Sequence, residues 1–238
     1  MFIRSKKNIV IISVFLLTIF TFILCFSSIS KPVESQTLAS KFKIVLDAGH
    51  GGIDGGVSGV KTKVKESEIN LIVTKKLEKY LVDAGFEVVL TRKSSAGLYG
   101  IATSNRKIKD MKKRSQIINE EKPTLVVSIH MNKYSVSTRR GAQVFYKESD
   151  NQGYLLAKSV QDSFNSMSQA TRKLSPLKGD YYILNCSNYP SIIAECGFLS
   201  NPEEEALLIT DEYQDQIAYA IFKGIIDYFS VCSFKFCY

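Results

Sequence analysis

The chain has 238 residues, of which 45% are hydrophobic and 23% are charged, and it carries a net charge of +8 at pH 7. This composition is typical of a folded protein with one ordinary core, and it excludes an intrinsically disordered chain. The moderate positive charge suits an anionic surface such as a cell wall, but no basic-aromatic motif of a nucleic-acid-binding protein is present. The five cysteines show no C-x-x-C spacing. The sequence is compatible both with a disulfide between Cys232 and Cys237 and with free thiols.

The first 30 residues have the pattern of a signal peptide or a membrane anchor. Arg4, Lys6 and Lys7 precede an uncharged apolar run from Ile9 to Phe26, which is the order of regions in an export signal. The run is close to the minimum length that can span a bilayer. The sequence is therefore compatible both with a signal peptide that is cleaved and with a membrane anchor that is retained. The basic flank predicts that the rest of the chain lies outside the cytoplasmic membrane. We expect three further parts: a polar linker over residues 31–40, a single folded domain over 41–230 and a tail over 231–238.

After residue 40, strand-like and helix-like segments alternate along the chain. Short apolar runs predict strands over residues 42–47, 86–92, 124–132, 141–147, 181–184 and 191–199. Apolar residues at helical spacing predict helices over residues 66–85, 104–122, 151–167, 201–209 and 211–229. The alternation is typical of βαβ units. It predicts one α/β domain with a twisted, mostly parallel sheet that helices cover on both faces.

The chain has only two histidines, and each comes at the end of a strand-like apolar run. His50 follows "KIVLDAG" and His130 ends "LVVSIH". Ligands of open α/β sheets bind outside the carboxyl ends of the strands, so both imidazoles are expected at one edge of the sheet. Two imidazoles and a carboxylate are a known ligand set of catalytic zinc. The glycines around His50 are expected to let the chain turn and to leave room for a substrate.

Several carboxylates are candidates for the third ligand: Asp47, Asp54, Glu66, Glu68 and Glu195. Glu66 begins a helix after a glycine-containing loop and can point back over the strand ends, whereas Glu68 lies on another side of that helix. A first-turn glutamate can also serve only to complement the helix dipole. Asp54 is the rival ligand, although an aspartate beside glycine often caps a turn. Asp47 is expected to accept a hydrogen bond from a histidine ring or a backbone N–H.

Glu195 terminates an apolar run, where a carboxylate is costly unless it has a partner or a function. Beside a metal-bound water, such a glutamate is the usual general base, which takes the proton and delivers it to the leaving nitrogen. A glutamate tied to loop N–H groups is the structural alternative. Cys196 does not compete as a nucleophile, because it would point to the opposite face of the strand.

Five segments, in this order, closely resemble the zinc-dependent N-acetylmuramoyl-L-alanine amidases of the Amidase_3 family: "LDAGHGGIDGG", "ESEINL", "LTR", "VVSIHMN" and "ECGFLSNPEEEALL". The resemblance implies a phosphorylase/hydrolase-like α/β sheet and one Zn²⁺ held by His50, Glu66 and His130. It also implies that Glu195 is the catalytic glutamate. The implied reaction is hydrolysis of the amide between N-acetylmuramic acid and L-alanine in peptidoglycan.

Two further segments, "NRKIKDMKKRSQIINE" and "RRGAQVFY", resemble the sporulation amidases that prepare muramic-δ-lactam in spore cortex. This implies a role in germination and export to the cell wall or the forespore intermembrane space, either secreted or anchored in the membrane. It also implies an activating or targeting partner protein, because a single catalytic domain lacks a wall-binding module. Asn70 and Asn132 match the family pattern. No inserted autoinhibitory helix is evident between His130 and Glu195, so we expect an open site.

Two other functions have to be weighed against the amidase. A zinc peptidase acting on the stem peptide would need the same metal and the same base. A non-catalytic peptidoglycan-binding module would not need an intact ligand set together with Glu195. The mass of the released fragment separates amidase from peptidase.

Overall fold

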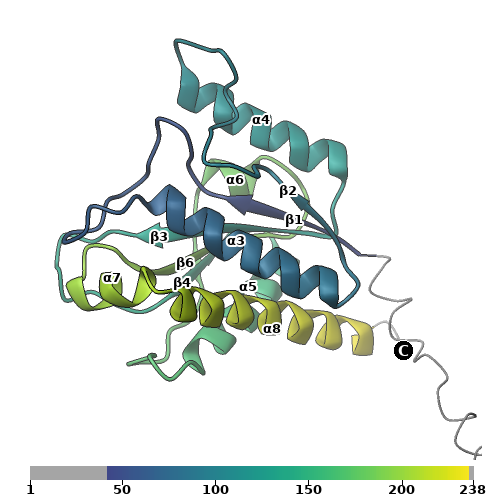
Figure 1. Cartoon of the computed structure of the whole chain (residues 1–238). Coiled ribbons are helices and arrows are strands. Elements are labelled where there is room, and N and C mark those ends of the chain that lie inside the picture. The colour runs from purple at the N-terminus through teal and green to yellow at the C-terminus, as the bar shows by residue number, and fades with distance from the viewer. Residues whose placement is uncertain (1–41, 236–238) are drawn as a thin grey trace, which may run out of the picture. The chain divides into compact units, whose positions relative to one another are not determined.

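The structure is a computed structural model, and it describes residues 42–235 (Figure 1). The predicted signal or anchor over residues 1–30 and the linker over 31–40 lie outside the described residues, as does Cys237 with its candidate disulfide. Within residues 42–235, no helix combines the length and the apolar character that crossing a membrane requires.

A six-stranded sheet forms the centre of the described domain (Figure 1). Its strands are β1 (Lys43–Ala48), β2 (Glu87–Leu90), β3 (Leu125–Asn132), β4 (Gln143–Tyr146), β5 (Leu177–Lys178) and β6 (Ser191–Phe198). Their order across the sheet is β2-β1-β3-β6-β4-β5. The strands β2, β1, β3 and β6 are mutually parallel, β4 is antiparallel to β6, and β5 is parallel to β4. The prediction of a mostly parallel sheet is confirmed.

Helices cover both faces of the sheet, as predicted, but unequally. They are α3 (Glu66–Asp83), α4 (Arg106–Glu121), α5 (Asn151–Asn165), α6 (Tyr182–Asn185), α7 (Pro202–Leu208) and α8 (Asp211–Lys235). On one face α8 packs against both α3 and α5, and the three helices enclose the main core. On the other face α4 and α6 cover a smaller core around Val45, Val126 and Ile193. The sheet therefore lies between two packed layers of helices.

The prediction of a strand over residues 181–184 is wrong, because Tyr182–Asn185 form the short helix α6. Ile183 and Leu184 are both buried in the smaller core, whereas neighbouring residues of a strand point to opposite faces. The Asn185 N–H donates to the Tyr181 carbonyl, which closes one helical turn. A short apolar run fits a buried strand and a buried helical turn equally well, which explains the error.

Two differences concern the ends of elements. The two-residue strand β5 was not predicted, because both of its residues are exposed and it has no apolar pattern. Helix α8 continues to Lys235, beyond the predicted end at Phe229 and into the predicted tail. No glycine or proline follows Phe229 to stop the helix.

A buried ion pair joins β1 to α4 beneath the loop that carries His50. Arg114 Nη1 lies 2.5 Å from Asp47 Oδ1, and the two side chains are 1% and 3% exposed. Ser128 and Thr91 donate hydrogen bonds to the same carboxylate. Arg114 also donates to the carbonyl of His50. The pair therefore fixes the chain at the point where it leaves β1.

This ion pair predicts how stability depends on pH. Burial alone would raise the pKa of Asp47, but the Arg114 charge and the hydrogen bonds from Ser128 and Thr91 lower it from 3.8 to about 2. The folded protein thus binds this proton less tightly than the unfolded chain does. The contribution is complete above about pH 4 and is lost as the pH falls towards about 2.

We expect Asp47→Asn to lower the free energy of unfolding at pH 7 by about 3 kcal/mol, because it leaves the buried Arg114 without one of its two carboxylates. Asp110 remains as the second, with Oδ2 at 2.5 Å from Arg114 Nε. The measurement is urea unfolding, with Asp83→Asn as control because it breaks only the exposed Lys79 pair and should cost less than about 0.5 kcal/mol. Equal effects of the two substitutions, or a deficit in Asp47→Asn that persists unchanged at pH 2, would contradict the prediction.

Candidate metal centre and active site

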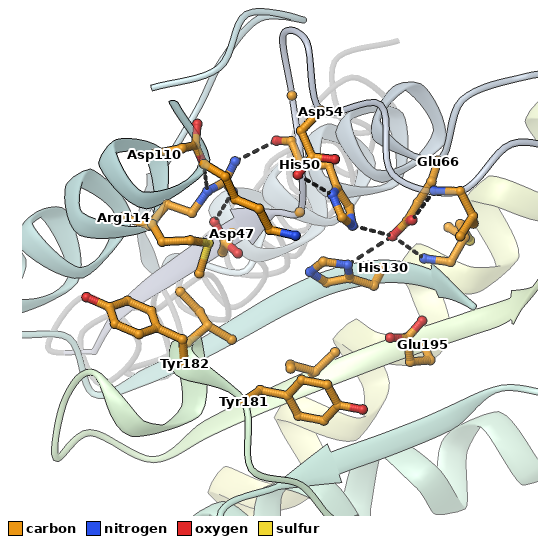
Figure 2. A pocket seen from close by; sticks show the side chains of 18 of the residues that line it. Asp47, His50, Asp54, Glu66, Asp110, Arg114, His130, Tyr181, Tyr182 and Glu195 are labelled. Carbon is orange, nitrogen blue, oxygen red and sulfur yellow. Dashed lines mark hydrogen bonds and ion pairs between the residues drawn. The ribbon is translucent and has the colours of Figure 1, made fainter. Parts of the chain in front are cut away.

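The structure brings His50, Glu66 and His130 together at the carboxyl ends of β1 and β3. One ligand atom from each residue lies within 4.8 Å of the other two. His50 Nε2 and His130 Nδ1 face the same carboxylate oxygen, Glu66 Oε1, at 3.3 and 2.9 Å. The imidazole rings stand edge to face, with centroids 5.0 Å apart, and Figure 2 shows both rings turned towards Glu66. The convergence expected from the strand ends is present.

The loop after β1 takes an uncommon backbone path to place His50. The residue has a φ of 61°, in the left-handed region that few non-glycine residues occupy. The Gly51 N–H donates to the Asp54 carbonyl, and the Asp54 N–H donates to the Gly51 carbonyl. These two hydrogen bonds close a tight turn after His50. Together with the bond from Arg114 to the His50 carbonyl, this turn holds the imidazole over the end of β1.

Two glycines of this loop leave space for the clustered side chains. A Cβ atom at Gly49 would lie 2.2 Å from the His130 ring, and one at Gly56 would lie 2.3 Å from Glu66 Oε2. Gly56 also has a φ of 67°, which favours glycine. The predicted role of the glycines is therefore refined, because these two make room for the clustered residues themselves.

Glu66 begins α3 and is only 2% exposed. Main-chain N–H groups of Val57 and Met131 donate to its two oxygens at 2.9 and 3.1 Å. The Asn70 amide donates to Oε1 at 3.3 Å and to the Gly49 carbonyl at 3.1 Å. Burial opposes ionisation, but the two histidines outweigh it and hold the pKa of Glu66 well below its usual range. The carboxylate is thus ionised, fixed in place and able to act as an anionic ligand.

Asp54, the rival candidate for the third ligand, lies outside the three-residue cluster. It contacts the ring nitrogen of His50 that does not face Glu66. Its Oδ2 is 3.0 Å from His50 Nδ1, and its Oδ1 accepts the Gly56 N–H, as expected for a turn cap. Burial alone would lower the pKa of His50, but Glu66 and Asp54 raise it to about 9. A bound metal ion would displace the proton on Nε2, and the ring would keep its proton on Nδ1 towards Asp54. Glu68 is exposed on α3 and takes no part.

The donor set fits a zinc ion. Two imidazole nitrogens and one carboxylate are ligands that catalytic zinc uses, with one position left for water. The carboxylate behind His50 is the partner that metal-binding histidines usually have. All three residues line one cavity of about 620 Å³, so water and a substrate can reach the centre of the cluster.

Glu195 lies beside His130, because the two residues are register partners on the adjacent parallel strands β6 and β3. Its Oε2 is buried and has no hydrogen-bond partner among the residues that the structure describes. Burial raises the pKa of Glu195 to about 7, against the lowering effect of His130. No N–H group of residues 42–235 holds this oxygen, which argues against the structural alternative. Cys196 belongs to the main core on the other face, as predicted.

The cavity is open to solvent, as expected. The side chains of His50 and His130 are 22% and 20% exposed. Tyr181 and Tyr182, at the start of α6, form the wall across from His50 in Figure 2. Among the elements between β3 and β6, α5 packs on the far face against α8, and no helix of the described domain fills the cavity.

The site depends on two arginines that sequence reasoning missed. Asp47 was expected to accept a hydrogen bond from a histidine ring or a backbone N–H. Its carboxylate instead pairs with the Arg114 guanidinium and accepts hydrogen bonds from the hydroxyls of Thr91 and Ser128. Arg92 is 3% exposed and donates to the carbonyls of Gly49 and Ser67. A carboxylate inside an apolar strand signals a buried cation, but nothing in the sequence identifies which of many basic residues supplies it.

Comparison with known proteins agrees with this geometry. The sequence model of the Amidase_3 family, described as N-acetylmuramoyl-L-alanine amidase, matches residues 44–227. The chain is 38% identical over 191 residues to the germination-specific N-acetylmuramoyl-L-alanine amidase of Bacillus subtilis, an alignment that covers 79% of each protein.

Solved structures give the same result. The CwlD amidase from Clostridioides difficile, determined in complex with the GerS lipoprotein, superimposes with a TM-score of 0.76 at 37% identity and covers 80% of this chain and 99% of that chain. The catalytic domain of the amidase CwlV from Bacillus (Paenibacillus) polymyxa var. colistinus has a TM-score of 0.67 at 28% identity, with coverage of 80% and 99%. The chain belongs to the N-acetylmuramoyl-L-alanine amidases of the Amidase_3 family.

Proposed function

We propose that this amidase hydrolyses the bond between N-acetylmuramic acid and L-alanine in peptidoglycan with one Zn²⁺ held by His50, Glu66 and His130. Glu195 is the general base of the proposed reaction. The observation that carries the proposal is the convergence of three ligand atoms within 4.8 Å beside a buried Glu195 oxygen that has no hydrogen-bond partner within residues 42–235. Family membership supplies the substrate class.

Each residue of the cluster has a distinct task in this reaction. A bound zinc ion would supply a Lewis acid that polarises the scissile carbonyl and acidifies water. Glu66 is oriented by main-chain N–H groups of two segments, and Asp54 holds the His50 ring, so the ligand positions exist before the substrate binds. Glu195 accepts a proton from the attacking water and passes it to the alanine nitrogen as the amide breaks.

Removal of one histidine tests the metal site. We expect His130→Ala to lose bound zinc and the release of peptides, because two ligands alone hold zinc poorly. The measurements are the zinc content of the purified protein and mass spectrometry of the soluble fragments from peptidoglycan. Glu68→Gln is the control, since Glu68 is exposed on the same helix as Glu66. A His130→Ala protein that keeps one zinc per chain would refute this ligand set.

Substitution of the proposed base separates metal binding from turnover. Glu195→Gln should keep its zinc and its fold but lower kcat by about 10²–10⁴-fold, the usual contribution of a general base. The released fragments also identify the bond that is cut: peptides beginning with L-alanine indicate an amidase, and shortened stems indicate a peptidase. Turnover by Glu195→Gln at the rate of the unmodified enzyme would show that another group is the base.

We further propose that the enzyme acts outside the cytoplasmic membrane, in the formation of muramic-δ-lactam that spore germination requires. The similarity to the germination-specific amidase of Bacillus subtilis supports this role, and the basic-apolar pattern of residues 1–26 supports export. The complex of the similar CwlD amidase with the GerS lipoprotein supports an activating or targeting partner.

Expression of this protein in spores that lack their own germination amidase tests the proposed role. We expect it to restore the muramic-δ-lactam in cortex fragments, and unchanged fragments would argue against the role.

A further inference from the structure

The active-site cavity continues on the side of β4 and β5. A hollow of about 260 Å³ shares Asn132 and Tyr181 with the active-site cavity. A second hollow, of about 420 Å³, follows it. Both are lined by Tyr134, Arg139 and Arg140, and the second also by Arg172. We call the two hollows together the arginine groove.

The arginine groove has an excess of positive charge. The Arg139 guanidinium stacks over the Tyr134 ring at 5.6 Å, and among residues 42–235 neither Arg139 nor Arg172 has an acidic partner within 4.0 Å. Arg140 is neutralised by Glu203 at 2.9 Å. Within the described part of the chain, the guanidinium groups of Arg139 and Arg172 are therefore without a carboxylate partner and able to bind an anion.

Nearby acidic side chains do not cancel this charge. Glu204 is 5% exposed and accepts main-chain N–H bonds from Gly141 and Phe198, so it is committed to the loop. At the opposite end of the active-site cavity, Asp54 and Asp110 line the wall together with Arg106, Lys107 and Arg114, so that end carries charges of both signs. The guanidinium groups of Arg139 and Arg172 would attract an anionic part of a substrate that extends into the arginine groove.

The groove begins at a defined distance from the catalytic cluster. Asn132 follows His130 by two residues on β3, a separation of about 7 Å along a strand. An extended peptide advances by roughly 3.5 Å per residue. A stem peptide that leaves the scissile amide in this direction reaches the near end of the groove, at Asn132, at about its second residue.

We propose that the arginine groove binds a carboxylate of the acidic stem peptide, close to the second residue after the scissile amide, and so selects stems that carry a free carboxylate there. The inference rests on the proposed function, since it assigns one side of the cavity to the peptide. A guanidinium pairs with a carboxylate through two parallel hydrogen bonds. Stacking on Tyr134 holds Arg139 flat and lowers the entropy lost on binding.

Binding of free peptides tests the groove without turnover. The probes are L-alanyl-γ-D-glutamyl-L-lysine and the same peptide with its glutamyl α-carboxyl group amidated. We expect the acid to bind the zinc-loaded protein about tenfold more tightly in titration calorimetry, the effect of about one charged hydrogen bond. The preference should vanish in Arg139→Gln/Arg172→Gln. Lys158→Gln/Lys223→Gln removes the same charge from exposed positions on α5 and α8 and should keep the preference.

Turnover of muropeptides with the same two stems separates this inference from the proposed function. The acid should have the lower KM at similar kcat, and the double arginine variant should lose the difference while keeping its zinc and fold. Equal binding and equal KM for acid and amide, or a preference that survives in the arginine variant, would overturn the inference. Tighter binding of the acid through the arginines without cleavage of either muropeptide would support the groove and count against hydrolysis by the enzyme without its partner.

Discussion

The buried carboxylate of Glu66 is the constraint on which the site depends. It lies at the start of α3, and it binds the loop after β1 through the Val57 N–H and strand β3 through the Met131 N–H. The same group faces both histidines. A carboxylate that is 2% exposed would be costly without these partners. The ionised side chain therefore requires all three segments to be in place, and it ties the order of the ligand cluster to the folding of the sheet.

A second set of buried charges stabilises the loop from the other side. Arg114 and Arg92 are almost fully buried and direct their guanidinium groups at the carbonyls that end β1. Such groups favour a structure only when their hydrogen bonds are complete, and here Asp47, Asp110 and the main chain supply the acceptors. The left-handed backbone at His50 is thus held by contacts from α4 and from the segment that follows β2, neither of which contributes a residue to the cluster of His50, Glu66 and His130.

The parts of this structure that could be predicted are those with a local signal. Apolar periodicity places β1, α3, β3 and β6, and the rule that ligands gather at strand ends brings His50 and His130 together. The choice of Glu66 over Asp54 came from the family resemblance, since spacing alone left both open. The pairing of Asp47 with Arg114 spans 67 positions and has no local pattern. For the same reason nothing in the sequence brings Arg139 and Arg172 together, because two separate loops meet only in the folded sheet.

The topology of the sheet explains how the cluster of His50, Glu66 and His130 and the arginine groove can lie next to each other. Glu195 pairs in register with His130 on the parallel side and with Gln143 on the antiparallel side, so the proposed base lies where the two halves of the sheet meet. The parallel half directs its strand ends, and hence the ligand cluster, to one edge. Across that boundary, the loops beside β4 and β5 are free of the cluster and carry the arginine groove. In the proposed function, chemistry and selection of the stem are therefore built on different strands, and substitutions in the groove are expected to alter which peptide is accepted without displacing His50, Glu66 and His130.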